Sequence, residues 1–137
     1  MLKIGKREFK NATLNFSSLA NLKSDNEYDI LLMSAVIDLV DNYQSFIDQI
    51  IIKVNPKLII IDRTLFTALD YDFWTVKDTN KNITGHKKYP LCFLSQSKFD
   101  NFMESRGFKQ KDHWNTSDNK LVSKMQIGTY KGFCYER

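Results

Sequence analysis

Glycine, proline, cysteine and histidine are all scarce in this chain of 137 residues, which holds five, two, two and two of them. The glycines are scattered, and none forms a Gly-x-Gly pair directly after a strand-like run. The sequence therefore lacks the glycine-rich turn with which many nucleotide-binding folds approach a phosphate. It also lacks a P-loop, a Gly-x-Ser-x-Gly elbow and a His-Glu-x-x-His helix, which removes the motif-based signs of several common enzyme classes. The five glycines are Gly5, Gly85, Gly107, Gly128 and Gly132.

The few cysteines and histidines do not have the spacing of a metal site. Cys92 and Cys134 lie in apolar, strand-like runs, so we expect buried free thiols rather than a disulfide. His86 and His113 have no cysteine partners close by in the sequence. We therefore predict no bound metal.

Long apolar runs are missing as well. The start, Met1 to Arg7, has no apolar core of the kind that marks a signal peptide, and no run is long enough to span a bilayer. Hydrophobic residues make up 42% of the chain and aromatic residues 13%. These values are typical of one globular domain, and we predict a single cytoplasmic domain over residues 1–137 with no membrane partner.

Charge is unevenly distributed along the sequence. Residues 1–74 hold 8 Lys or Arg and 10 Asp or Glu, whereas residues 75–137 hold 12 and 6. The second half could meet an anionic partner, or it could simply have a solvated lysine-rich surface. Because no run of Lys or Arg is present, a nucleic-acid partner is not expected.

The middle of the chain predicts a strand–helix–strand unit. Residues 28–33 form a continuous apolar strand, and residues 57–61 form a second. Between them the apolar positions of 43–54 recur at helical spacing, and Asn55-Pro56 ends the helix. Asp41 with Gln44 resembles a capping box at its start. Two strands joined in this way predict a right-handed parallel βαβ unit.

The flanking segments predict further elements. Residues 12–16 read as a first strand and 73–76 as a short strand, whereas 77–88 read as a polar loop. A second helix should begin at the Ser97/Asp100 capping box, bury Phe99, Phe102 and Met103, and end at Gly107. Residues 108–114 and 125–135 predict a closing antiparallel hairpin, with a bulge at Gly132.

Polar residues follow three of these strands, where ligands bind in open α/β sheets. The three sets are Ser17-Ser18, Ser34 through Asp38, and Asp62-Arg63-Thr64, and we single out Ser17, Ser34 and the last run as candidate binding residues. The loop that ends at Tyr89-Pro90 and contains His86 could close over them. Asp62 and Arg63 could equally satisfy only each other and the strand end. No catalytic residue is identified, and Asp38 and Asp41 are interpreted as carboxylates that favour a helix N-terminus.

This order of elements resembles the C-terminal portion of class I S-adenosylmethionine-dependent methyltransferases. The similarity is greatest to a bacterial methyltransferase family associated with surface-polysaccharide gene clusters. It covers roughly residues 12–135, and Leu65 stands where that family usually has a proline. The matching segments are Leu14-Asn15-Phe16, Tyr28-Asp29-Ile30-Leu31-Leu32-Met33-Ser34-Ala35-Val36, Ile60-Ile61-Asp62-Arg63-Thr64, Tyr89-Pro90, and Phe99 through Trp114 with Gly107-Phe108.

The resemblance implies an α/β fold with a partial Rossmann-like methyltransferase sheet. It would consist of a βαβ unit and a C-terminal antiparallel hairpin, with residues 14–16, 28–33 and 57–61 as the third, fourth and fifth strands. Ser17 and Ser34 would then bind S-adenosylmethionine, near the adenine and the methyl group respectively. Asp62, Arg63, Thr64, His86 and Tyr89 would border the acceptor, a saccharide or another small polar molecule.

The resemblance also implies that the first two strands of the family sheet, with their glycine-rich loop, have no counterpart in residues 1–11. Those strands lie between the third and fourth, so the edge of Tyr28–Met33 would be open and would invite pairing. We therefore predict a rearranged sheet, a homodimer or a partner chain at this edge. Three functions remain: a methyltransferase fragment completed by another polypeptide, a non-catalytic binding or oligomerisation module, and a basic nucleic-acid binder.

Overall fold

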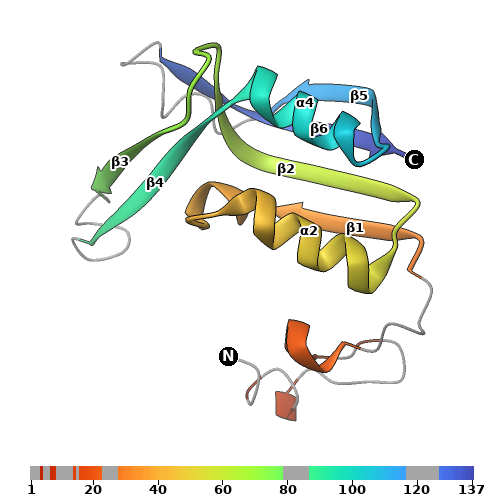
Figure 1. Ribbon diagram of the computed structural model, residues 1–137. Coiled ribbons are helices and arrows are strands. Elements are labelled where there is room, and N and C mark those ends of the chain that lie inside the picture. Colours follow the sequence, from red (N-terminus) through yellow and green to blue (C-terminus); the bar gives the residue numbers. More distant parts are fainter. Residues whose placement is uncertain are drawn as a thin grey trace.

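In the computed structural model the described residues are 28–78, 87–116 and 127–137, together with positions 4, 7, 8, 14 and 16–22. They form an α/β fold around a mixed six-stranded sheet (Figure 1). The strands run in the order β3-β4-β2-β6-β5, and β1 pairs with β2 off this path. The predicted α/β class with a partial Rossmann-like sheet is thereby confirmed.

The predicted βαβ unit is present. It comprises β1 (Ile30–Ser34), helix α2 (Tyr43–Val54) and β2 (Leu58–Thr67), with the two strands parallel and in register from Ile30↔Leu58 to Ser34↔Asp62. Helix α2 ends where predicted, with Asn55 in the left-handed region at φ 43° ahead of Pro56. The predicted cap was wrong by one residue: the side chain of Asn42, not Asp41, accepts the N–H of Ser45 at 3.0 Å.

Strand β2 does not end at the charged run, as the sequence had suggested, but continues to Thr67. Asp62 and Arg63 together lie opposite the single residue Gly132, because the pairing with β6 shifts between Ile61 and Thr64. This is a β-bulge, and Arg63 takes a φ of 51° within it. The bulge was predicted at Gly132, which instead lies on the strand facing it. A bulge can place polar residues inside a strand, which is why the charges resembled a strand end.

Both ends of the segment read as a polar loop belong to a hairpin in the described residues. Strands β3 (Phe73–Asp78) and β4 (Lys88–Ser95) pair antiparallel from Phe73↔Phe93 to Asp78↔Lys88. Strand β4 also runs parallel to the end of β2, at Phe66↔Leu94 and Thr67↔Ser95. The hairpin projects from one end of the sheet (Figure 1). Residues 79–86 at its tip lie outside the described residues.

The C-terminal part follows the prediction closely. Helix α4 (Gln96–Ser105) leads through Gly107, at φ 82°, into β5 (Lys109–Asn115), which pairs antiparallel with β6 (Gly128–Glu136). The predicted cap again needs correction. Ser95, rather than Ser97, accepts the N–H of Lys98, because the helix begins directly where β4 ends.

The predicted first strand is not seen in its described residues, since Leu14 and Phe16 lie outside any strand. A single turn, η1 (Leu19–Asn21), follows instead and lies beside α2, whose Lys53 donates from Nζ to the carbonyl of Leu19 at 2.9 Å. Neither Leu14 nor Phe16 pairs with a described strand of the sheet, so the spacing of these two apolar residues does not reflect strand pairing.

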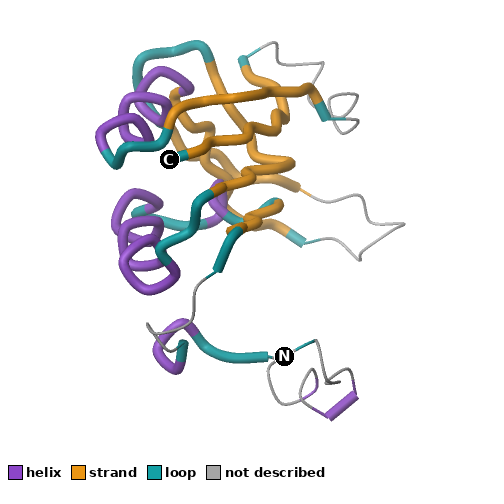
Figure 2. Tube along the Cα trace, turned by 90° about the vertical axis from the view of Figure 1, so that its right-hand side faces the viewer, coloured by secondary structure: helices purple, strands orange, loops and turns teal. Residues whose placement is uncertain are grey.

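Both longer helices, α2 and α4, cover the same face of the sheet (Figure 2). The main core lies under them and joins Met33, Ile47 and Phe99 to residues of β2 and β6. On the opposite face of β1, Ile30 and Leu32 remain 56% and 62% exposed. Cys92 is buried and Cys134 half-buried, and both are free thiols as predicted. None of the helices in the described part of the chain is long and apolar enough to cross a membrane.

Candidate functional site

The bulge of β2 joins three strands through one carboxylate. Asp62 accepts a hydrogen bond from the Ser34 hydroxyl at 3.3 Å and another from the indole N–H of Trp114 at 3.1 Å. Ser34 is its register partner at the carboxyl end of β1, and Trp114 lies on β5. The indole rests directly over Gly132, where a Cβ would lie only 2.0 Å from a ring carbon. The glycine is thus what allows Trp114 to reach Asp62.

The chain leaves β1 in a strained turn held to the same bulge. Ala35 has a φ of 51°, and its N–H donates to the carbonyl of Asp62 at 2.9 Å. A single helical turn follows, η2 (Ile37–Leu39), which buries Ile37 completely. This turn places Asp38 below the bulge, with 3% of its surface exposed.

A cavity of about 180 Å³ opens at this point, between the turn after β1, the bulge of β2 and the β3–β4 hairpin. It is lined by three charged side chains, two tyrosines and three aliphatic residues. These are Asp38, Arg63, Lys77, Tyr89, Tyr130, Ala35, Leu39 and Leu91. A small cavity with a few convergent polar groups is the usual form of a binding site for a small molecule.

Asp38 is the most buried acid of the site. One of its carboxylate oxygens, Oδ1, has no hydrogen-bond partner. Burial raises the pKa of this carboxyl to about 6, while the backbone of Asp38, the charge of Lys77 and the backbone of Leu65 oppose the rise. Buried polar atoms are normally paired, and perturbed acids gather at functional sites, so Asp38 is the residue that most clearly marks this cavity.

Lys77 faces the same cavity from β3. Its Nζ donates to the hydroxyl of Tyr130 at 3.2 Å and lies over the rings of Tyr130 and Tyr89, at 5.5 and 6.0 Å from their centroids. Burial lowers the pKa of Lys77, but the hydrogen bond to Tyr130 and the two phenols outweigh it, and the pKa is raised. The lysine is therefore a fixed positive charge at neutral pH.

The structure brings together only some of the residues predicted from the sequence. Arg63 and Tyr89 line the cavity. Ser34 and Asp62 lie beside it and bond to each other. Thr64 is fully buried, and its hydroxyl donates to the carbonyl of Asp62 at 3.3 Å, which is a structural contact.

Two of the predicted binding residues do not join this group. Ser17 is exposed next to η1, and its hydroxyl donates to the carbonyl of its neighbour Ser18 at 3.2 Å. It is not among the residues that line the cavity. His86 lies outside the described residues.

Sequence reasoning missed Lys77 and Tyr130 and interpreted Asp38 as a helix-end carboxylate. Lys77 had no clear signal in the sequence, because the exposed positions that alternate with it along β3 include the apolar Trp74 and Val76. Tyr130 is brought to the site only by the pairing of β6 with β2, at Leu65↔Tyr130. Such a long-range contact has no local sequence signature.

Other chemical groups near the site are inert. Burial raises the pKa of Cys92 to about 11, so its thiol stays protonated at neutral pH and is no nucleophile. Among the described residues, no three His, Cys, Asp or Glu side chains are grouped as metal ligands would be.

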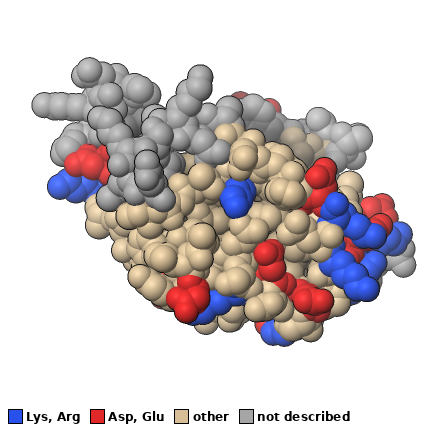
Figure 3. All heavy atoms as spheres, turned by 90° about the horizontal axis from the view of Figure 1, so that it is seen from above, with Lys and Arg blue, Asp and Glu red and all other residues tan. Residues whose placement is uncertain are grey.

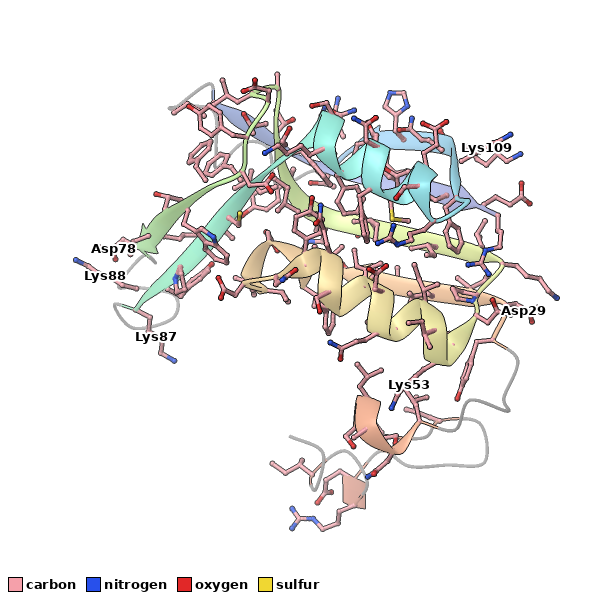
Figure 4. The ribbon with its side chains drawn as sticks, in the orientation of Figure 1. Asp29, Lys53, Asp78, Lys87, Lys88 and Lys109 are labelled. Carbon is pink, nitrogen blue, oxygen red and sulfur yellow. The ribbon has the colours of Figure 1, made fainter. Side chains whose placement is uncertain are left out.

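The face seen from above carries mixed charge, with basic and acidic side chains gathered together at one end of the molecule (Figure 3). Ion pairs of this kind include Lys111–Glu136 at 2.8 Å and Arg106–Asp48 at 2.7 Å. At the tip of the hairpin, Asp78 and Lys88 lie 3.9 Å apart, with Lys87 beside them (Figure 4).

Comparisons with known proteins give a match in structure alone. No family model matches the sequence, and no curated protein matches it either. A crystal structure of an S-adenosylmethionine-dependent methyltransferase from Clostridium acetobutylicum superposes with a TM-score of 0.53. The match covers 98% of this chain and 68% of that chain, at 11% sequence identity. The chain therefore has a methyltransferase-like, Rossmann-type fold.

Proposed function

We propose that this chain, as a single domain, is the acceptor-binding part of a methyltransferase-like protein that uses S-adenosylmethionine. One observation carries the proposal: the lined cavity lies beyond the carboxyl end of β1 and beside the bulge of β2. In open α/β sheets this is the end of parallel strands where ligands bind. The superposition with a methyltransferase over nearly the whole chain supports the same reading.

The described residues fit only part of a site for S-adenosylmethionine. Ser34 and Ala35, at the end of β1, are exposed and could face a cofactor. The three described glycines lie after α4 or within β6, however, so none forms a turn at the end of a parallel strand. We therefore assign no chemical step to the cofactor, and we propose that another polypeptide segment completes its site.

The acceptor would be a small polar molecule such as a saccharide. The charged and hydroxyl groups that line the cavity support this choice. Arg63 and Tyr89, both expected from the sequence to border the acceptor, are among the residues that line the cavity.

The test is a titration of the ¹⁵N-labelled protein with S-adenosylhomocysteine, followed by amide chemical shifts. We expect weak binding, with shifts concentrated at residues 34–36 and 62–63. Ser34→Ala should weaken the binding, whereas Ser97→Ala, an exposed serine on α4, should not. Shifts at another surface, or none up to millimolar ligand, would remove the cofactor from the proposal.

A second candidate function is oligomerisation, and the exposed edge strand favours it. Among the described strands, β1 pairs with β2 alone, and its outward face exposes Ile30 and Leu32. An uncovered apolar edge strand is a ready template for pairing with a second copy, which a two-fold axis would make self-complementary. We propose a homodimer through β1 as this alternative.

Light scattering on a concentration series distinguishes this alternative. A dimer that Leu32→Lys converts to a monomer, while Ile52→Lys on the exposed side of α2 does not, would support pairing at β1. A monomer at every concentration would refute it. The two candidates are separable because cofactor binding and dimer formation are read independently.

A further inference from the structure

The unassigned feature of the cavity is its combination of a buried acid, one of whose oxygens has no partner, with a fixed cation. Asp38 contributes an oxygen without a hydrogen bond, and 3% of its surface is exposed. Lys77 contributes a positive charge held in place by two tyrosines. Acid and cation belong to one cavity but reach it from different elements, η2 and β3.

Asp38 and Lys77 would contact different chemical groups of a ligand. A carboxylate oxygen accepts hydrogen bonds, so the Oδ1 atom of Asp38, which has no partner, suits a donor such as a hydroxyl group. Lys77 donates to a phenol rather than forming one of the charge-paired contacts seen for Lys57 and Lys111. Its ammonium group has three donors and can take an anionic oxygen in addition.

The other residues that line the cavity restrict the charge and the size of the ligand further. Arg63 adds a second positive charge at the rim, and the hydroxyl groups of Tyr89 and Tyr130 can donate or accept. Leu39 and Leu91 add apolar surface to the lining. A cavity volume of about 180 Å³ favours a small ligand.

We propose that the cavity binds a small hydroxylated anion, a sugar acid or hydroxy acid of monosaccharide size or less. Its anionic group contacts Lys77, and one of its hydroxyl groups donates to Asp38. This inference rests on the proposed function only in taking the ligand to be the methyl acceptor. The binding itself requires no cofactor.

The experiment uses D-glucuronate as the probe and follows binding by isothermal titration and by amide shifts. D-Glucose, which has hydroxyl groups without the anion, and cyclohexanecarboxylate, which has the anion without hydroxyl groups, are the matched ligands. We expect glucuronate to bind at least about tenfold more tightly than either matched ligand. It alone can make both the charge-assisted contact with Lys77 and the hydrogen bond to the buried oxygen of Asp38.

Variants assign the two contacts. Lys77→Gln should weaken glucuronate about tenfold and leave glucose nearly unchanged, because it removes the charge and keeps much of the length. Asp38→Asn should weaken both sugars. Lys88→Gln, at the exposed tip of the same hairpin, is the control and should change nothing (Figure 4).

Several results would overturn the proposal. Equal binding of glucuronate and glucose would show that the anionic group does not contribute. Equal losses of affinity in Lys77→Gln and Lys88→Gln would show that the ligand does not bind in the cavity. Absence of binding by all three probes would mean that the cavity takes no such ligand. A folded state for each variant is established by its amide spectrum. If none of the three probes binds but S-adenosylhomocysteine does, the proposed methyltransferase function is unaffected. If S-adenosylhomocysteine does not bind but glucuronate does, the proposed ligand of the cavity is unaffected.

Discussion

At the scale of single residues, the contact between Gly132 and Trp114 explains how the bulge is held. The indole fits only because β6 has no side chain beneath it, and it then donates to Asp62 at 3.1 Å. The same carboxylate accepts from Ser34, so one acid connects the end of β1, the bulge within β2 and Trp114 of β5. Loss of the glycine should therefore disturb more than one strand.

We predict that Gly132→Ala lowers the free energy of unfolding by about 2 kcal/mol, because the new methyl group displaces the indole from a closely packed position. In a Trp74→Phe background the fluorescence of Trp114 should shift to the red as its ring becomes solvated. Gly107→Ala is the control: it strains a φ of 82° with nothing within 4 Å, so it should destabilise without moving the emission. An unchanged spectrum in Gly132→Ala would contradict the packing.

Asp38 predicts a specific dependence of stability on pH. The unfolded chain ionises this carboxyl near pH 4, whereas its pKa in the folded chain is about 6. The folded state thus binds the extra proton between these values, and its stability falls as the pH rises through this window. Two pKa units correspond to roughly 3 kcal/mol. Arg63, Lys77, Tyr89, Cys92 and Tyr130 are the charged and titratable groups on the strands around it.

Asp38→Asn should remove this slope. The urea midpoint of the variant should decline less than that of the wild type from about pH 4 to about pH 7. Taking the difference between the two proteins cancels other acids, such as Asp48, whose pKa the hydrogen bond from Arg106 lowers. Parallel curves for the two proteins would mean that Asp38 is ionised normally in the folded chain.

At the scale of elements, the start of α2 offers a direct choice between two caps. The sequence pattern favoured Asp41, whereas the structure places the side chain of Asn42 on the N–H of Ser45. We predict that Asn42→Ala costs about 1 kcal/mol of unfolding free energy, since an N–H at the helix start loses its acceptor. Asp41→Ala should cost little. Chemical denaturation of both variants decides the matter, and the opposite ranking would restore the sequence-based cap.

The hairpin β3–β4 is the element that makes the cavity. Without it, the cavity would lose one side and one of its two cations, because Lys77, Tyr89 and Leu91 all come from its two strands. A stacked pair, Phe73 and Phe93 at 4.7 Å between centroids, holds the two strands together near the sheet. The position of Lys77 therefore depends on packing some distance from the cavity.

At the scale of the whole molecule, the two longer helices lie on one face of the sheet, and the opposite face of β1 is left uncovered by the described residues. Met33 and Leu32 are neighbours on β1, yet Met33 is 4% exposed beneath the helices and Leu32 is 62% exposed. Class I methyltransferase-like sheets are doubly wound, with helices on both faces. The bare face is thus where a completing segment or a second copy would pack.

This asymmetry gives a prediction for two adjacent residues. Met33→Ala should cost about 3 kcal/mol of unfolding free energy, as is usual for a buried methionine. Leu32→Ala should cost less than about 1 kcal/mol at low protein concentration. Denaturation at two concentrations measures both. A large, concentration-dependent loss for Leu32→Ala would show that this face is covered in solution.

The sequence predicted more of the fold than of the candidate site. The helical spacing of Tyr43 to Val54 and the apolar runs on either side predicted the βαβ unit, because burial of one face requires that spacing. Gly107 likewise predicted the end of α4, since a left-handed residue is needed there. The bulge was predicted on the wrong strand, at Gly132 of β6, because Asp62 and Arg63 within a strand look the same in sequence as at its end.

Local patterns of burial, turns and caps were therefore determined by the sequence itself, because they depend on residues close together in the chain. The cavity was decided by tertiary structure alone. Asp38, Lys77 and Tyr130 are far apart in sequence and meet only because β6 pairs with β2 and the hairpin folds back beside η2. Such pairings depend on the packing of the whole sheet, and no short segment encodes them.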